Sequence, residues 1–145
     1  MNDKSTSLAN IRWIDLVSNT DDRGTLTSIE SSQCTPFEIK RIFYMHHVKA
    51  DRGGHSHLDT DQVIIAISGN FKVDIHDGQE QKTYTLNDCT QGLYVPRRLF
   101  TSLYEFDTSD ICLVLASTHY EQHKSQRNWE EFIEMKKRSD HVSNT

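Results

Sequence analysis

Short apolar segments, each bounded by polar turn residues, recur from residue 11 to residue 116 and decide what this chain can fold into. Several of them alternate apolar and polar side chains, as Phe71-Lys-Val-Asp-Ile75 does, which is typical of a strand with one buried face. Between them lie turn residues such as Asp77-Gly78, which favour a tight hairpin. Strands are expected over residues 11–17, 25–30, 37–45, 63–68, 71–75, 82–86, 92–96, 100–106 and 111–116. Many short strands at even spacing indicate a sandwich or barrel.

The period of the apolar pattern changes only near the C-terminus. Trp129 and Phe132 recur at helical spacing over residues 128–137, where acidic residues come first and Lys136-Lys-Arg138 come last. This charge order suits the dipole of an α-helix. The sequence therefore predicts one short C-terminal helix after an all-β body.

Length and composition fit a single cytoplasmic domain. The chain has 145 residues, of which 35% are apolar and 26% charged, and no apolar run approaches the roughly 20 residues that span a bilayer. A single domain is expected over residues 11–138, with a flexible leader at 1–10 and a disordered tail at 139–145. The polar leader has no apolar core that would make it a secretory signal.

Charge and cysteine content exclude several further classes. The net charge is −5 and no dense block of Lys and Arg occurs, so nucleic acid and membrane surfaces are not expected partners, whereas an anionic small molecule remains compatible with a locally basic pocket. Cys34, Cys89 and Cys112 are odd in number and far apart, so they match neither a disulfide framework nor a zinc motif. Reduced thiols in the cytoplasm are the expectation.

The stretch Arg52-Gly-Gly-His-Ser-His57 carries the clearest functional signal. His55 and His57 are two residues apart, so both side chains lie on one face if the segment is a strand. The two glycines before them permit a backbone turn that other residues resist. Two imidazoles aimed the same way, just before the apolar run at 63–68, either hold a metal or move protons.

The spacing of this stretch resembles the first motif of the cupin superfamily, here His55-x-His57-x4-Gln62-x6-Gly69. Metal-binding cupins place Glu where this chain has Gln62, and they add a histidine after the Gly…Pro turn, where residues 97–103 contain none. Two neutral imidazoles and an amide make a poor site for a divalent ion. Asp59, Asp61 and His76 remain possible substitutes as ligands. We expect a site without metal or cofactor.

Beyond this motif, the chain resembles one family, the small cupin-fold 3,4-ketoisomerases that act on dTDP-4-keto-6-deoxyglucose (WxcM-like sugar ketoisomerases). The similar segments, in order over roughly residues 11–133, are Asp22–Leu26, Pro36–Tyr44, Arg52–His57, Gln62 with Ile67–Gly69, Gly92–Pro96, Leu113–Ser117, Tyr120 and Arg127–Phe132. The resemblance implies a cupin-type antiparallel β-sandwich or jelly roll. It also implies a homodimer that exchanges N-terminal strands, and a role in making deoxysugars for surface polysaccharides.

The reaction that the resemblance implies suits the paired histidines. Moving a ketone from C4 to C3 of the sugar removes the proton at C3, passes through an enediol and returns a proton at C4. A histidine titrates near neutral pH and can perform both steps. We therefore expect His55 and His57 to be the acid/base pair, with Tyr44 as a nearby hydroxyl that relays protons or hydrogen-bonds the enediol.

The dTDP-linked keto-sugar also needs residues that bind it. The expected substrate-binding residues are Arg23, Gln62, Arg97, Arg98 and Thr101. An arginine matches the bidentate geometry of a diphosphate. For the first of these arginines, an equally consistent interpretation is that it only braces a turn with Asp21 or Asp22.

The chain also departs from the family pattern, and two other functions stay open. Leu58 replaces the usual lysine, and Phe100 and Thr101 replace a Trp followed by Arg or His. These changes are the main support for a non-catalytic cupin that binds sugar nucleotides or a partner. A related cupin sugar-nucleotide epimerase would need a His–Asp dyad and a tyrosine acid, which the sequence does not let us place.

Overall fold

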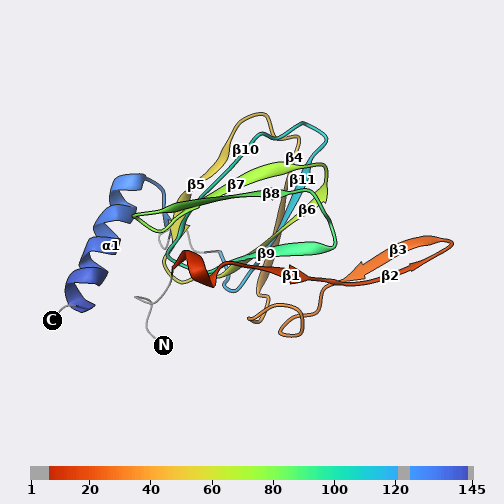
Figure 1. Ribbon diagram of the computed structural model, residues 1–145, viewed down its shortest axis with the longest axis horizontal. Helices are drawn as coiled ribbons and strands as arrows, with labels where there is room; N and C mark the ends of the chain where they lie inside the picture. The colour runs from red at the N-terminus through yellow and green to blue at the C-terminus, as the bar shows by residue number, and fades with distance from the viewer. Residues whose placement is uncertain (1–6, 121–124, 144–145) are drawn as a thin grey trace.

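Two five-stranded antiparallel sheets face each other and form the body of the protein (Figure 1). The structure is a computed structural model, and it describes residues 7–120 and 125–143. The first sheet has the order β1 (Arg12–Asp15), β9 (Gln91–Val95), β6 (Gln62–Ser68), β11 (Ile111–Ala116) and β4 (Arg41–His46). The second has the order β12 (Ser125–Gln126), β5 (Arg52–His57), β10 (Phe100–Tyr104), β7 (Phe71–His76) and β8 (Gln81–Leu86). The expected all-β jelly-roll sandwich is confirmed.

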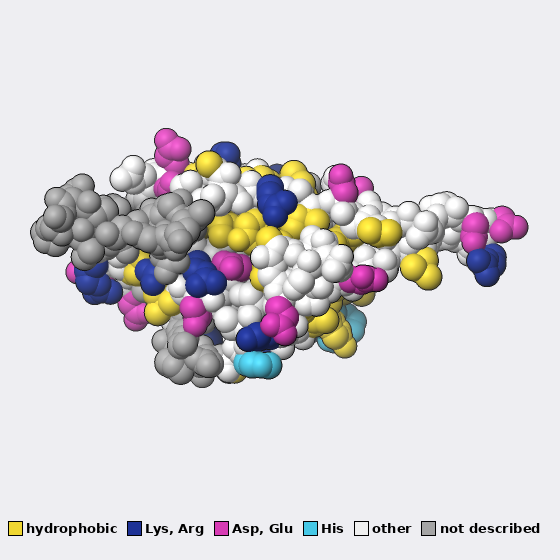
Figure 2. Space-filling model, turned by 90° about the horizontal axis from the view of Figure 1, so that it is seen from below, with side chains coloured by type: hydrophobic (Ala, Val, Ile, Leu, Met, Phe, Trp, Pro, Cys, Tyr) yellow, Lys and Arg dark blue, Asp and Glu magenta, His cyan; other side chains and the backbone are white. Residues whose placement is uncertain are grey.

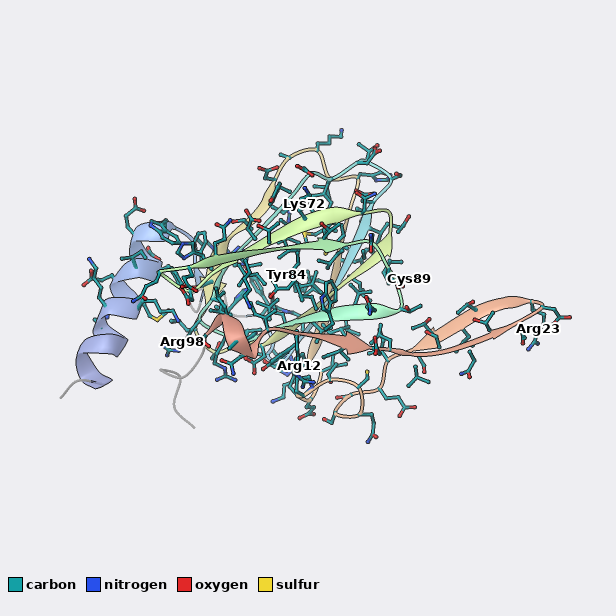
Figure 3. The ribbon with its side chains drawn as sticks, viewed as in Figure 1. Arg12, Arg23, Lys72, Tyr84, Cys89 and Arg98 are labelled. Atoms are coloured by element: carbon teal, nitrogen blue, oxygen red, sulfur yellow. The ribbon has the colours of Figure 1, made fainter. Side chains whose placement is uncertain are left out.

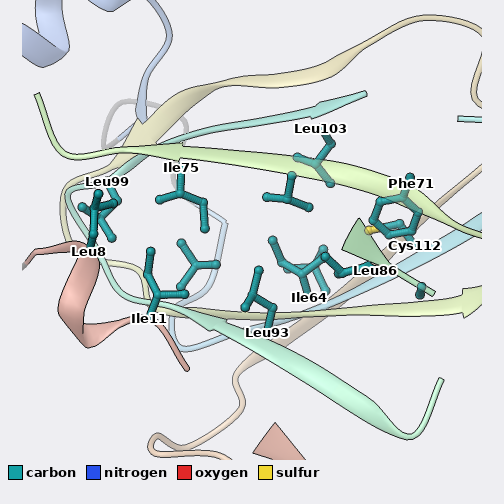
Figure 4. Packing of buried hydrophobic residues seen from close by; sticks show 14 residues of the cluster. Leu8, Ile11, Ile64, Phe71, Ile75, Leu86, Leu93, Leu99, Leu103 and Cys112 are labelled. Atoms are coloured by element: carbon teal, nitrogen blue, oxygen red, sulfur yellow. The ribbon is translucent and has the colours of Figure 1, made fainter. Parts of the chain in front are cut away.

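Strand alternation fills the space between the two sheets with apolar side chains (Figure 4). In β7, Phe71, Val73 and Ile75 are at most 1% exposed, while the residues between them face outward. Leu93 of β9 meets them from the facing sheet, and Leu103 of β10 lies beside Val73 in the same sheet. Burying side chains of this size contributes about 1.5–3 kcal/mol each to folding. This burial fixes the register of the strands, because a slip by one residue would turn these side chains out to solvent.

The first sheet is apolar on its outer face as well. There Ile14, Leu16, Val63, Ile65 and Leu115 form a second buried cluster. It is covered by the segment at 29–39, whose own apolar side chains are partly buried. Because β6 has neighbours on both faces, it is apolar at almost every position.

The outer face of the first sheet continues beyond this cover and becomes exposed. Ile42 and Tyr44 of β4 are 59% and 63% exposed, and Ile67 of β6 is 43% exposed. Since β11 lies between β4 and β6 and pairs with both, these side chains lie on one face of the sheet, two strands apart. The protein thus carries exposed apolar side chains on this face, from the edge strand β4 to the central strand β6.

A hairpin of β2 (Val17–Asp21) and β3 (Gly24–Ser28) projects from the body as a separate two-stranded sheet (Figures 1 and 2). Every residue of β2 is exposed, and the apolar side chains of Val17 and Leu26 are 60% and 66% exposed. No other strand of the described chain pairs with the hairpin. An isolated two-stranded hairpin is at best marginally stable in water.

The expected C-terminal helix is α1 (Trp129–Ser143), which packs at one end of the sandwich (Figure 1). Asn128 accepts a hydrogen bond from the backbone N–H of Glu131 at 2.8 Å and so caps the first turn. Phe132 and Met135 are buried, and the Trp129 ring meets the His76 ring edge-on with centroids 4.7 Å apart. The helix thereby closes the end of the second sheet.

The bounds of several elements differ from those expected. Residues 8–10 form a 3-10 helix with Leu8 buried, and α1 runs to residue 143, whereas residues 1–6 and 144–145 of the expected leader and tail lie outside the described residues. The strand expected over 11–17 is divided between β1 and β2, and β4 begins four residues after the start expected at 37. Neither β2 nor β12 was expected. No helix in the described part of the chain is long and apolar enough to cross a membrane.

Candidate active site

A cavity of about 470 Å³ opens between the two sheets. Apolar side chains of Phe43, Met45 and Val114 line it on the first sheet, and Leu103 lines it on the second. Polar and charged groups line the rest, which are Arg41, Arg52, His55, His57, Asp59, Thr60, Gln62, Thr101, Thr118, His119, Tyr120, Ser125 and Arg127. A cavity of this size, with apolar walls and polar groups that converge on one region, is typical of a small-molecule site.

Glycine lets β5 carry its histidines close to the neighbouring strand. Gly53 has φ +83°, and a Cβ at that position would lie 2.8 Å from the backbone oxygen of Thr101. The pairing of β5 with β10 shifts register between Thr101 and Ser102, and Thr101 stands opposite His55. Residues 52–57 can therefore form a strand that reaches the cavity, because glycine at position 53 permits both the positive φ and the close approach of β5 to β10.

The two imidazoles point into the cavity together, as the spacing predicted. The Nε2 atoms of His55 and His57 are 3.1 Å apart, and their ring planes are nearly perpendicular at 89°. The side-chain nitrogen of Gln62 lies 3.3 Å from the same Nε2 of His57. Among the residues that the structure describes, no three His, Cys, Asp or Glu side chains gather where they could hold a metal ion.

Burial keeps both imidazoles neutral. It is the main cause that lowers the pKa of His57 to about 4, and the nearby His55 and Arg41 lower it further. Burial likewise is the main cause that lowers the pKa of His55; a hydrogen bond to the Gly53 backbone opposes it, and Arg127 and Arg52 lower the pKa slightly further. A neutral imidazole has a free lone pair, so at neutral pH each histidine is ready to accept a proton.

Four of the expected site residues meet in this cavity, namely His55, His57, Gln62 and Thr101. Tyr44 does not, and its expected position near the histidines was wrong. Along β4 the exposed and half-buried side chains alternate, so Phe43 and Met45 face the cavity while Tyr44 faces outward beside His46. The resemblance located the strand, but the alternation of side chains decides which of its residues face the cavity.

Arg97 and Arg98 do not line the cavity either. Arg97 is held by Asp61, with Nε 3.2 Å from Oδ1 and a terminal nitrogen 3.2 Å from Oδ2. The Arg98 side chain runs to the end of the sandwich that α1 covers and donates to the Met135 sulfur at 3.3 Å (Figure 3). Its backbone N–H donates to the His57 carbonyl at 2.8 Å. Within one chain, both residues therefore stabilise the turn that packs against the end of β5, and neither side chain lines the cavity.

Arg23 lies at the far tip of the hairpin, away from the cavity (Figure 3). Its side chain is 87% exposed and pairs with Asp21 at 2.7 Å. Within one chain, Arg23 therefore braces its own turn through Asp21, which was one of the two interpretations of this residue.

Sequence reasoning missed the arginines that do line the cavity, Arg41, Arg52 and Arg127. The Arg41 guanidinium lies 5.2 Å from the Phe43 ring centroid and 5.3 Å from that of Tyr120. Its Nε is buried and has no hydrogen-bond partner among the described residues. All three arginines lie within segments that carried the family resemblance or beside them, and the strand alternation with Phe43 would have placed Arg41 inward.

A jelly-roll sandwich with paired histidines in a polar-lined cavity defines the class of protein as cupin-type. Within that class, the family model described as "FdtA: WxcM-like, C-terminal" matches residues 9–137, and the chain belongs to this family. The resemblance inferred from the sequence segments is thereby confirmed.

Two proteins that are similar to this chain over most of its length are named as sugar 3,4-ketoisomerases. The chain is 32% identical over 114 residues to TDP-4-oxo-6-deoxy-alpha-D-glucose-3,4-oxoisomerase of Aneurinibacillus thermoaerophilus, covering 77% of this chain and 82% of the relative. The crystal structure of QdtA, a sugar 3,4-ketoisomerase of Thermoanaerobacterium thermosaccharolyticum in complex with TDP, superposes with a TM-score of 0.87 at 34% identity, covering 91% of this chain and 98% of that one. A histidine-to-asparagine variant of QdtA has also been solved in complex with TDP-4-keto-6-deoxyglucose.

A more distant structure shares the fold alone. The RmlC epimerase of Mycobacterium tuberculosis superposes with a TM-score of 0.68 at 14% identity, covering 83% of this chain and 70% of that one.

Proposed function

We propose that this protein is a sugar-nucleotide 3,4-ketoisomerase that converts dTDP-4-keto-6-deoxyglucose into a dTDP-3-keto-6-deoxyhexose. The observation that carries the proposal is the pair of neutral imidazoles, 3.1 Å apart, inside a cavity of a chain that belongs to this family. The alternatives of an epimerase and of a non-catalytic cupin receive less support, because the relatives that match over most of this chain are 3,4-ketoisomerases.

The reaction needs proton transfers only. A base removes the C3 proton, which the C4 ketone acidifies, while O4 takes up a proton, and an enediol with a C3=C4 double bond results. The O3 hydroxyl then loses its proton as C4 receives one, which leaves a ketone at C3 and a hydroxyl at C4. His55 and His57 are the acid/base pair, since neighbouring imidazoles can accept and return these protons in turn.

The nucleotide and the sugar occupy different parts of the cavity. The diphosphate lies against Arg41, Arg52 and Arg127, because guanidinium groups bind phosphate oxygens in bidentate pairs. The unpartnered Nε of Arg41 is one donor available to a phosphate oxygen. Gln62 and Thr101 flank the two histidines and contact the sugar.

The functional unit is a homodimer that exchanges N-terminal strands. The projecting hairpin has exposed apolar residues at Val17 and Leu26, and an exposed apolar patch lies at Ile42, Tyr44 and Ile67. A second copy of the chain covers both surfaces, and it gives the hairpin the neighbours that an isolated two-stranded sheet lacks.

In that dimer, the hairpin tip reaches the cavity of the partner. Arg23 would then contact the substrate bound to the other copy, which reconciles its family resemblance with its distance from its own cavity. Its guanidinium group can bind a phosphate or a sugar oxygen.

The biological setting is deoxysugar biosynthesis for surface polysaccharides. The cytoplasm is the compartment we propose, and the three unpaired cysteines, Cys34, Cys89 and Cys112, suit a reducing environment.

Incubation with dTDP-4-keto-6-deoxyglucose in D₂O, followed by NMR, tests the proposed reaction. A carbonyl that moves to C3 with deuterium at C4 is the expected result. Deuterium at C5 without movement of the ketone would indicate an epimerase instead. Tight binding with neither exchange nor product would indicate the non-catalytic cupin.

A further inference from the structure

The two-residue strand β12 adds an edge to the strand that carries the histidines. It pairs antiparallel with β5, and Ser125 stands directly opposite His57. Residues directly opposite in an antiparallel pair project to the same side of the sheet. The Ser125 side chain therefore enters the cavity beside the His57 ring, where its Oγ lies 3.1 Å from Nδ1.

The other ring nitrogen of His57 has a different environment. Its Nε2 faces the side-chain nitrogen of Gln62 at 3.3 Å and the Nε2 of His55 at 3.1 Å. An amide nitrogen can only donate a hydrogen bond, so the Nε2 of His57 must accept it. A neutral imidazole has one N–H and one lone pair, so in this arrangement the hydrogen of His57 resides on Nδ1, and His55 donates its own Nε2–H to the Nε2 of His57. The hydroxyl oxygen of Ser125 is the acceptor in reach of that hydrogen.

We propose that Ser125 is a positioning residue that holds His57 in the Nδ1–H tautomer and so keeps Nε2 unprotonated, as the acceptor of the Gln62 hydrogen bond and of the proton taken from the substrate. The proposal deepens the proposed function, because it rests on His57 acting as a base.

A hydroxyl suits this task for two reasons. When His57 takes a proton on Nε2, the Nδ1–H bond to Ser125 persists, so the ring keeps its orientation until the proton returns. A hydroxyl is also uncharged, whereas a carboxylate at the same place would favour the charged imidazolium. Ser125 therefore fixes the orientation of the ring without favouring its protonation at neutral pH.

The geometry makes this role separable from folding. Backbone hydrogen bonds hold β12 against β5, and they do not involve the serine hydroxyl. Ser125→Ala removes the Oγ and keeps the backbone, and Ser125→Thr keeps a hydroxyl at the same position. These two variants are matched probes of a single hydrogen bond.

The first test measures the tautomer itself in protein labelled with ¹⁵N at histidine. Long-range ¹H–¹⁵N correlation spectra at neutral pH identify which ring nitrogen carries the hydrogen, and His57→Asn assigns the signals by their loss. The expected result is an Nδ1–H tautomer in the wild type and in Ser125→Thr, with a mixture of tautomers in Ser125→Ala. A wild-type spectrum with hydrogen on Nε2, or the same pure tautomer in Ser125→Ala, would overturn the proposal.

Kinetics give the second readout. At metal sites, loss of the group that orients a ligating histidine lowers activity by about 10- to 100-fold, and we expect an effect of similar size here. Ser125→Ala should reduce kcat by that factor while KM for the nucleotide sugar stays unchanged, and Ser125→Thr should recover most of the loss. Equal kcat in the alanine variant and the wild type would contradict the role. Full turnover in His57→Asn would instead remove His57 from catalysis and leave the tautomer result standing, so the two proposals fail separately.

Discussion

At the scale of single residues, the chemistry of the site depends on how little water reaches two side chains. His55 and His57 are both half-buried or deeper, and burial is the first cause that lowers the pKa of each. Their closeness adds to this effect at His57, because two positive charges 3.1 Å apart would repel each other. The same burial that makes His57 a base at neutral pH also costs stability when it must be protonated.

Replacing His57 with Asn tests its catalytic role. Asparagine retains a polar side chain but cannot accept and return a proton, so kcat should fall by about 10²- to 10⁴-fold while affinity for TDP is unchanged. Turnover by NMR and TDP binding by calorimetry measure the two quantities. His47→Asn is the matched control, since His47 lies outside the cavity and has φ +53°, which asparagine tolerates. Equal turnover in both variants would show that His57 is not the base.

A pH dependence of stability follows from the lowered pKa of His57. Between the ordinary value of 6.5 and the folded value of about 4, the unfolded chain binds a proton that the folded chain does not. The free energy of unfolding therefore falls as pH falls through this window, by on the order of 3 kcal/mol from this residue. Above pH 6.5 both states are neutral and the contribution is fully present.

Urea unfolding at pH 7 and at pH 4.5, at one protein concentration, checks this expectation. The wild type should lose more stability between the two values than His57→Asn, which has no such group to titrate. Equal losses in the two proteins would mean that protonation of His57 is not opposed by the fold.

At the scale of secondary-structure elements, the site is assembled by the strand β5 and its two neighbours. The strand β10 brings Thr101 opposite His55, and β12 brings Ser125 opposite His57. The close approach to β10 depends on glycine at position 53, where a side chain would collide with backbone. The position of the histidines is thus fixed by the packing of β5 as much as by their own spacing.

Alanine at each of the two glycines of the motif separates backbone angle from packing. Both Gly53 and Gly54 have positive φ, at +83° and +69°, so each substitution should cost roughly 1–2 kcal/mol from the left-handed conformation. Gly53→Ala should cost about 1–3 kcal/mol more, since its Cβ would lie 2.8 Å from the Thr101 oxygen, whereas nothing lies within 4 Å at Gly54.

Urea unfolding measures the difference, and turnover shows whether His55 has moved. The expected result is a larger loss of both stability and kcat in Gly53→Ala than in Gly54→Ala. Equal stability in the two variants would show that the approach of β5 to β10 is not constrained at this position.

Much of this layout could be predicted from the sequence, and there are physical reasons why the rest could not. Alternation located β7, and short apolar runs located β6 and β11. The spacing of His55 and His57 gave their common face, because a strand repeats every two residues. Ser125 and β12 were missed because two residues carry no periodic signal. Tyr44 was misplaced because a resemblance locates a strand without showing which way each side chain faces.

At the scale of the whole molecule, the chain exposes apolar surface and a hairpin that pairs with no other described strand. The β2–β3 hairpin projects away from the sandwich and carries Arg23 at its tip (Figures 1 and 3). Sequence inspection predicted an arginine in the substrate site, but only tertiary structure separates it from the histidines of the same chain. In the proposed homodimer a second copy would resolve this separation, because a hairpin exchanged across a two-fold axis would place each Arg23 at the cavity of the partner.

Mixing two inactive variants distinguishes a shared site from a site within one chain. In a heterodimer of Arg23→Ala and His57→Asn, a shared arrangement leaves one cavity intact, because the Arg23→Ala chain keeps its own His57 and receives Arg23 from its partner. The purified heterodimer should then have about half of the wild-type activity, because one of its two cavities is intact. An arrangement within one chain leaves every cavity with a defect, and co-expression would restore nothing. Co-expression with two different affinity tags, followed by turnover assays of the doubly purified dimer, makes the measurement, and each variant expressed alone is the control.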